Sequence, residues 1–201
     1  LPPQGLLAVA MAQPVNIAGT ALYNYTEGYG SYLIPAVMVI IIFQTLLMVI
    51  GMVTGEEHMT KGILAYTPFG KSWAVAIRIV SGKTFVYCSL YAVFSFFLLG
   101  LLPHFFSIPN IGNGLYIVLM MIPYLLATSF LGLAASRYFT DSEAPLLMIA
   151  FFSVGPATLA FVKLNSMGAS MADIRPEYIT LWIQAVIYFI LSAWVYKKKL
   201  S

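Results

Sequence analysis

Long apolar runs separated by short polar connectors dominate the chain from residue 32 onward. A helix rises 1.5 Å per residue, so about 20 apolar residues cross the roughly 30 Å hydrocarbon core of a bilayer. The pattern predicts five transmembrane helices, at residues 32–53, 84–102, 115–136, 145–162 and 178–196. We therefore expect an all-α, polytopic membrane helical bundle of about five spans, formed by residues 32–201.

Two of these runs carry internal features that predict how they pack. In the third run, Thr128, Gly132 and Ser136 recur every four residues and give the helix a small-residue face for close packing. In the fourth run, Gly155-Pro156 should break or sharply kink a helix. Backbone groups freed at that depth must be buried in protein or face a water-filled cavity. We expect a broken or re-entrant segment at Gly155-Pro156, with a plain kinked span as the alternative.

The longest polar interruption, residues 51–83, predicts a short amphipathic helix outside the membrane. Thr54-x-x-Glu57 fits a capping box, which would place Glu56 and Glu57 at the positive end of a helix that starts at Gly55. An apolar stripe at helical spacing and a proline stop follow, formed by Met59, Gly62, Ile63, Tyr66 and Pro68. Such a helix binds a partner or lies on the lipid headgroups.

Composition and charge assign a side of the membrane to each connector. The chain is 61% hydrophobic and 8% charged, whereas charged residues make up roughly a quarter of an ordinary soluble domain. The predicted alternation places eight of the ten Lys and Arg residues on the side of the C-terminal lysine tail, and only Lys163 and Arg175 on the other side. The C-terminus is therefore expected in the cytoplasm. Residues 1–31, rich in proline, glycine and tyrosine, would be an extracytoplasmic tail or linker. Nothing suggests nucleic acid binding.

Two short motifs resemble catalytic sites but lack the required context. Ser81-Gly82-Lys83-Thr84 resembles the end of a phosphate-binding loop, but Ile77 stands where its first glycine belongs, and a membrane-entering helix surrounds it. Glu56-Glu57-His58 finds no second histidine on its own side of the membrane. We expect no catalytic residue, no metal site, no directly bound cofactor and no enzyme activity. Arg78 and Lys83 should reach toward water.

A few polar or irregular positions within the spans are candidates for lining a transport pathway. They are Gln44, Tyr87, Tyr91, Gly155 and Pro156. Polar side chains inside a membrane mark pathways in many transporters. The alternative is structural, since a span glutamine can hydrogen-bond a neighbouring helix and span tyrosines can simply pack.

The order of several short motifs resembles one family of membrane proteins. The sequence reads Leu33-Ile34-Pro35 and Gln44-Thr45-Leu46-Leu47 in the first run, and then Gly55-Glu56-Glu57, Lys61-Gly62, Tyr66-Thr67-Pro68 and Ser81-Gly82-Lys83. From about Ser31 onward, this order resembles the membrane subunit of ABC-2-type transporters, the bacterial efflux permeases also called type V ABC exporters.

The resemblance implies a permease subunit of an efflux transporter in the bacterial cytoplasmic (inner) membrane. By the family pattern, residues 55–66 would be a coupling helix that docks on a separate cytoplasmic ABC ATPase, and the ATPase would bind ATP-Mg. The permease would pair with a second permease copy, as a homodimer or a paired permease. The family has six spans, so this chain would lack the first span and the extracytoplasmic domain that follows it. The alternative is a non-transporting membrane anchor or assembly subunit that binds a cytoplasmic partner.

Overall fold

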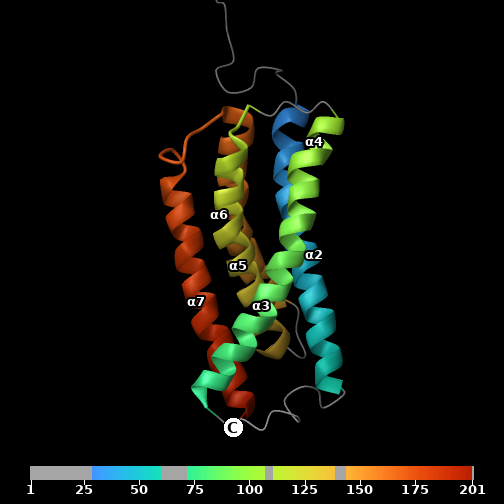
Figure 1. Cartoon of the computed structure of the whole chain (residues 1–201), viewed down its shortest axis with the longest axis vertical. Helices are drawn as coiled ribbons and strands as arrows, with labels where there is room; N and C mark the ends of the chain where they lie inside the picture. Colours follow the sequence, from blue (N-terminus) through green and yellow to red (C-terminus); the bar gives the residue numbers. More distant parts are fainter. Residues whose placement is uncertain (1–28, 60–71, 107–110, 139–143, 201) are drawn as a thin grey trace, which may run out of the picture.

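The computed structural model describes residues 29–59, 72–106, 111–138 and 144–200, and within these ranges the chain is helical with no strand. The elements are α2 (Tyr29–Met59), α3 (Trp73–Ser95), the π-helical turn η2 (Phe96–Leu101), α4 (Leu102–Phe105), α5 (Gly114–Tyr138), α6 (Ala144–Met167) and α7 (Arg175–Leu200). α3, η2 and α4 follow one another without a break and form one helical rod (Figure 1). The predicted all-α bundle is confirmed.

Four helical segments of the described chain are long and apolar enough to cross a membrane. They are Leu33–Thr54, Trp73–Phe105, Gly114–Ser136 and Arg175–Lys198. Each overlaps one of the predicted spans. α6 covers the remaining predicted span and is a helix of 24 residues.

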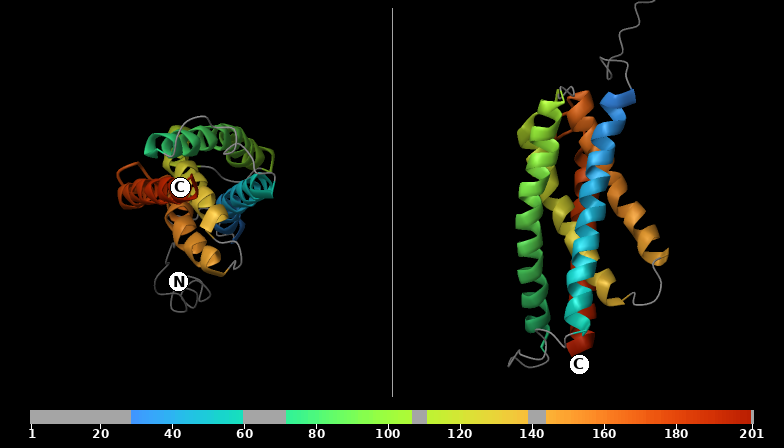
Figure 2. Two further views of the ribbon diagram at one scale, coloured as in Figure 1. Left: turned by 90° about the horizontal axis from the view of Figure 1, so that it is seen from below. Right: turned by 90° about the vertical axis from the view of Figure 1, so that its right-hand side faces the viewer.

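The helices run side by side along the long axis of the molecule, and α5 lies among the others (Figures 1 and 2). α5 contacts α2, α3, α6 and α7. In its most apolar stretch 72% is buried, against 22% for the rod of α3, η2 and α4. α5 carries no charged residue between Gly114 and Ser136. This centre can therefore be buried without leaving a charge unpaired.

The predicted small-residue face of α5 contacts α2 closely. A Cβ atom at Gly132 would come within 3.0 Å of Ile50 Cδ1 and 3.2 Å of Leu47 Cδ2. The two helices approach to this distance because the glycine has no side chain. One buried hydrogen bond adds to the contact, since the Tyr124 hydroxyl donates to the Val39 carbonyl of α2 over 2.7 Å.

α6 corrects the expectation of a broken or re-entrant segment at Gly155-Pro156. The helix continues from Ala144 to Met167 with Pro156 inside it. Proline removes one backbone hydrogen bond, at a cost of about 3 kcal/mol. In an apolar surrounding all other backbone groups still need partners, and a continued helix supplies them. Near the proline, the Thr158 hydroxyl donates to the Val154 carbonyl over 2.9 Å.

The two ends of the bundle carry different sets of charged residues. The end that holds the last turn of α2, the start of α3 and the last turns of α7 is called the lysine end below, and the opposite end is called the far end (Figure 1). At the lysine end, Lys197 Nζ lies 4.3 Å from the centre of the Trp73 ring and so ties the tail to α3. Lys163 and Glu177 form an ion pair at the far end. This separation agrees with the predicted alternation of spans.

At the far end, two glycines allow the segment before α5 to contact the end of α6. A Cβ atom at Gly112 would lie 2.2 Å from the Leu164 carbonyl oxygen, and Gly168 has a φ of +62°. The Ile111 amide donates to the Asn165 carbonyl over 3.1 Å. Only a residue without a side chain fits the first position, and the left-handed backbone favours glycine at the second.

Candidate functional site

The last turn of α2 differs from the predicted start of a new helix. α2 continues without a break through Thr54 and Gly55 to Met59. Thr54 is therefore inside a helix and does not cap one, so the predicted capping box is wrong. The backbone hydrogen bonding of α2 continues past the end of its apolar run, so no new helix start is formed at Thr54 that would need a cap.

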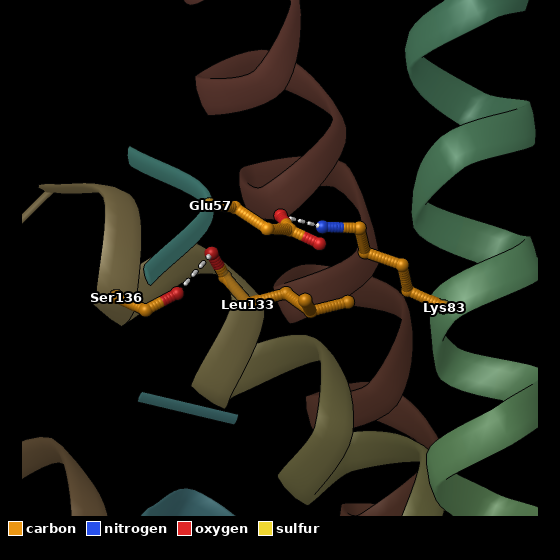
Figure 3. Close-up of polar contacts among 4 residues, drawn as sticks. All are labelled: Glu57, Lys83, Leu133 and Ser136. Carbon is orange, nitrogen blue, oxygen red and sulfur yellow. Dashed lines mark hydrogen bonds and ion pairs between the residues drawn. The ribbon is translucent and has the colours of Figure 1, made fainter. Parts of the chain in front are cut away.

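The carboxylate of Glu57 pairs with the ammonium of Lys83, which joins the end of α2 to α3 (Figure 3). The side chains are 18% and 15% exposed, respectively. The sequence predicted that Lys83 reaches toward water, and this prediction is wrong. Lys83 instead pairs with the carboxylate that the neighbouring helix α2 presents. Little water surrounds the pair, so its attraction is screened less than that of a surface pair.

α7 contributes an aromatic ring to the same place. Lys83 Nζ lies 5.6 Å from the centre of the Tyr196 ring, within the range of a cation–π contact. Tyr87, one turn along α3, lies close enough to Glu57 and Tyr196 to interact with both electrostatically. The side chains of Tyr87 and Tyr196 are buried. Glu57, Lys83, Tyr87 and Tyr196 thus link three helices, and we call these four residues the lysine-end cluster.

Two buried threonine hydroxyls lie next to the lysine-end cluster in the sequence. Thr54 precedes Glu57 by one turn of α2, and Thr84 follows Lys83 on α3. Neither Oγ1 atom has a hydrogen-bond partner among the described residues. A buried hydroxyl without a partner costs about 1–3 kcal/mol. The lysine end therefore combines a shielded ion pair with polar atoms that this arrangement of the helices does not satisfy.

Ser136 of α5 lies near the same ion pair in Figure 3. Its hydroxyl donates to the Leu133 carbonyl over 3.2 Å. This hydrogen bond stays within α5.

The predicted coupling residues fall partly within the described chain. Glu56 is exposed, whereas Glu57 turns toward Lys83. The two acids therefore face different surroundings, although the sequence had assigned them one role. Met59 is the last residue of α2. Gly62, Ile63, Tyr66 and Pro68 lie outside the described residues.

The predicted pathway residues do not gather in one place. Tyr87 and Tyr91 lie one turn apart on the buried face of α3. Gln44 is exposed on α2, so within one copy it lines no interior space. Gly155 is exposed and Pro156 half-buried on α6, a helix that packs against α2, α5 and α7.

Enzyme-like motifs gain no support from the geometry. Ser81-Gly82-Lys83-Thr84 lies inside α3 and forms no phosphate-binding loop. Across the described residues, no three His, Cys, Asp or Glu side chains gather as metal ligands.

Sequence reasoning missed the Glu57–Lys83 pair. It treated Glu57 as a capping residue and Lys83 as a residue that reaches toward water. The signal was present, because opposite charges stand near the ends of two consecutive predicted spans joined by one connector. Helices so joined are usually neighbours, and isolated charges at their ends tend to pair.

The long apolar helices identify the chain as an integral membrane protein. Comparison with known families then gives its group: the model of a family described as "ABC-2 family transporter protein" matches residues 3–162, well over half of the chain. The chain belongs to this family and is a component of a membrane transporter. No curated protein and no solved structure matches it.

Proposed function

We propose that this chain is the permease subunit of an ATP-driven exporter. In this proposal it forms the export pathway together with a second permease copy, and a separate cytoplasmic ABC ATPase hydrolyses ATP-Mg. The family match supports the general role, and the charge distribution supports a cytoplasmic C-terminus in a bacterial inner membrane. The ion pair between Glu57 and Lys83 is the observation that carries the proposed coupling.

The proposed coupling segment begins within the last turns of α2. Residues 55–66 and Pro68 would dock on the ATPase, with Glu56 on the exposed side and Glu57 directed into the bundle. Because Glu57 holds Lys83, a displacement of this segment would move α3 together with α2. The Tyr196 ring beside Lys83 would pass the same displacement to α7.

A transport cycle needs at least two arrangements of the spans, and ATP can drive it only if the ATPase binds them unequally. The lysine end offers a physical basis for a second arrangement. Thr54 and Thr84 hold hydroxyls that find no partner here, and a shift of α2 against α3 could give them partners. Each unsatisfied hydroxyl costs about 1–3 kcal/mol. This cost is similar to the coupling free energy of about 1–3 kcal/mol that typically links two sites of an allosteric protein.

A test starts from the full-length permease, co-expressed with an ABC ATPase if a neighbouring reading frame is found to encode one. Both are purified together and reconstituted in vesicles. We expect Glu57→Gln to leave the complex assembled and to lower the ATPase stimulation by the permease about tenfold or more, the factor that corresponds to about 1.4 kcal/mol. Gly62→Trp should prevent assembly itself, because a bulky ring would enter the docking surface.

Thr180→Val is a matched control, since its hydroxyl bonds within α7 and its side chain is exposed. This variant should assemble and stimulate as the native protein does. Unchanged stimulation in Glu57→Gln would refute the role of the ion pair. Stable binding of a cytoplasmic partner with no ATPase activity in any preparation would favour a membrane anchor instead.

A further inference from the structure

A narrow apolar groove lies between the rod of α3 and η2 and the first half of α5. It has a volume of about 220 Å³ and is lined from Ala92 to Gly100 on one side and from Gly114 to Leu125 on the other. The groove is not part of the lysine-end cluster. Among the described residues that line the groove, Ser95 is the only one with a polar side chain.

The π-helical turn lies at this groove. The Leu102 amide donates to the Phe97 carbonyl, five residues back, which marks the wider turn of a π-helix. Such turns are rare and often occur at functional sites. Two glycines also border the groove, and neither would obstruct it with a Cβ atom. A Cβ atom built at Gly114 would meet no atom within 4 Å, and one built at Gly100 would meet only the Phe96 ring, at 3.9 Å.

The outer edge of the groove continues into the surface that faces lipid. Phe96, Val118 and Ile122 line it and are exposed. The neighbouring face of α3 is also apolar and exposed, at Phe85 and Leu90 among others. Because the helical rod and α5 span the membrane, hydrocarbon surrounds this surface and reaches the groove directly.

The dimensions match one lipid chain. Along α5 the groove extends from the first residue of the helix, Gly114, to Leu125, a length of about 16 Å at 1.5 Å per residue. One leaflet of the hydrocarbon core is about 15 Å thick, half of the roughly 30 Å total. A cavity of about 150 Å³ in another protein takes up benzene, and drug-sized ligands need about 300 Å³ or more. The groove therefore suits a slender chain.

We propose that this groove binds one acyl chain of a phospholipid from the leaflet at the far end. The headgroup lies near Gly114 and the chain runs down toward Leu125. The buried walls at Leu99, Ile117 and Met121 contact its methylene groups. The inference requires only that the chain spans a membrane and is independent of the proposed ATPase.

Ser95 distinguishes an acyl chain from a ligand with a polar group. Its side chain is buried, and its hydroxyl has no hydrogen-bond partner among the described residues. Hydrocarbon offers this hydroxyl no bond, so Ser95→Ala should bind the chain as well as the native protein or better. A transported amphiphile that uses the hydroxyl would bind the same variant more weakly.

Photolabelling tests the proposal with the full-length protein in vesicles of phosphatidylethanolamine and phosphatidylglycerol. A small fraction of the lipid is a phosphatidylcholine that carries a diazirine near the end of one acyl chain. After irradiation, peptide mass spectrometry locates the adducts. We expect adducts on the buried residues Leu99, Ile117 or Met121 as well as on the exposed Phe85, which reports bulk lipid.

Leucine at either glycine should fill the groove without a clash. Gly100→Leu and Gly114→Leu should each lower the yield of adducts on the buried residues about fourfold or more. Fourfold is the loss in binding expected when one methylene group of the acyl chain is no longer buried. Labelling of Phe85 should stay constant. Gly51→Leu is the matched control, because a Cβ atom there also meets nothing within 4 Å but lies on α2. Thermal unfolding of each variant checks its fold.

Four results would overturn the proposal. The first is labelling of Phe85 with none of the buried wall. The second is buried labelling that neither leucine variant lowers. The third is a loss of labelling in Ser95→Ala, which would identify a ligand that hydrogen-bonds. Cross-links between two copies at the groove, with the wall protected from lipid, would equally exclude an acyl chain.

Discussion

Among the described residues, an ion pair joins two consecutive helices at either end of the bundle, and the two pairs differ in their surroundings. At the lysine end, Lys83 and Glu57 are 26 residues apart and join α3 to α2. At the far end, Lys163 and Glu177 are 14 residues apart, with 2.5 Å between Nζ and Oε1, and join α6 to α7. Lys163 is 29% exposed, against 15% for Lys83.

The far-end pair is one of several bonds across the same turn. The Ala169 amide donates to the Lys163 carbonyl over 3.1 Å, and the amide of Ser170 donates to the Asp173 carboxylate over 2.8 Å. Ile174 is fully buried below the turn. Local backbone contacts therefore hold α6 and α7 together even without the ion pair.

The lysine-end pair bonds residues that lie on opposite sides of the connector 60–71, and it contacts a third helix through Tyr196. This contrast shows why the same chemistry can have two roles. A pair across a short turn that has its own backbone bonds mainly adds stability, whereas a pair between residues 26 apart can couple the positions of α2 and α3. The variants below test that difference, from the largest expected effect to the smallest.

Removing one partner at the lysine end should have the largest effect on stability. Lys83→Met removes the ammonium that pairs with the shielded Glu57 carboxylate. The cost should be about 2–3 kcal/mol, between the value of about 0–1 for surface pairs and about 3–5 for fully buried ones. Thermal unfolding in detergent measures it. A double-mutant cycle with Glu57→Gln should give a coupling energy of about 1 kcal/mol or more, and strictly additive effects would contradict the contact.

Steric crowding at the far end should come next. Gly112→Ala places a Cβ atom 2.2 Å from the Leu164 carbonyl oxygen, so the segment before α5 must move away from α6. We expect a loss of about 2 kcal/mol in the free energy of unfolding. Gly114→Ala is the control, because its Cβ meets nothing within 4 Å. Equal stability of the two variants would show that the two segments are not in close contact.

The far-end ion pair should matter less than the lysine-end pair. Lys163→Met should cost about 1 kcal/mol, because the lysine is more exposed and the turn keeps its backbone bonds. The effect on partner stimulation should be small. Arg175→Met, an exposed position nearby, provides the comparison. A larger loss than in Lys83→Met would reverse the contrast between the two ends.

The smallest effect should come from Asp173, which lies outside the spans. The amide and hydroxyl of Ser170 donate to its carboxylate and hold its pKa below the usual value of 3.8. A lowered folded pKa stabilises the fold above the unfolded value, and this contribution is lost as the pH falls through the folded value. Asp173→Asn should therefore be slightly less stable at neutral pH, with a difference that vanishes in strong acid. A difference that grows in acid would contradict this sign.

Much of the fold could be predicted from the sequence because its determinants are local and additive. An apolar run of about 20 residues specifies a spanning helix whatever its neighbours are. Charges between such runs identify which connectors share a side, and Lys197 beside Trp73 agrees with that assignment. Ser72 accepts a hydrogen bond from the Ala74 amide at the start of α3, where a polar residue precedes an apolar helix.

The candidate site was only partly predictable because it depends on pairs of residues that are distant in sequence. The capping box at Thr54 and Glu57 satisfies a local rule, but α2 continues through it. Gly155-Pro156 fits the local rule for a helix break, but α6 continues through it. In both places the need to bond every backbone group in an apolar surrounding outweighs the local signal.

The sequence by itself thus determined the all-helical class and the approximate place of each long helix, since hydrophobic length acts segment by segment. Only the tertiary structure decided that Glu57 meets Lys83 beside Tyr196, that the small-residue face of α5 receives α2, and that a π-helical turn leaves a groove beside α5. Those features depend on which faces meet and at what register. Side-chain packing between helices determines the faces that meet and their register, and no single segment of the sequence encodes that packing.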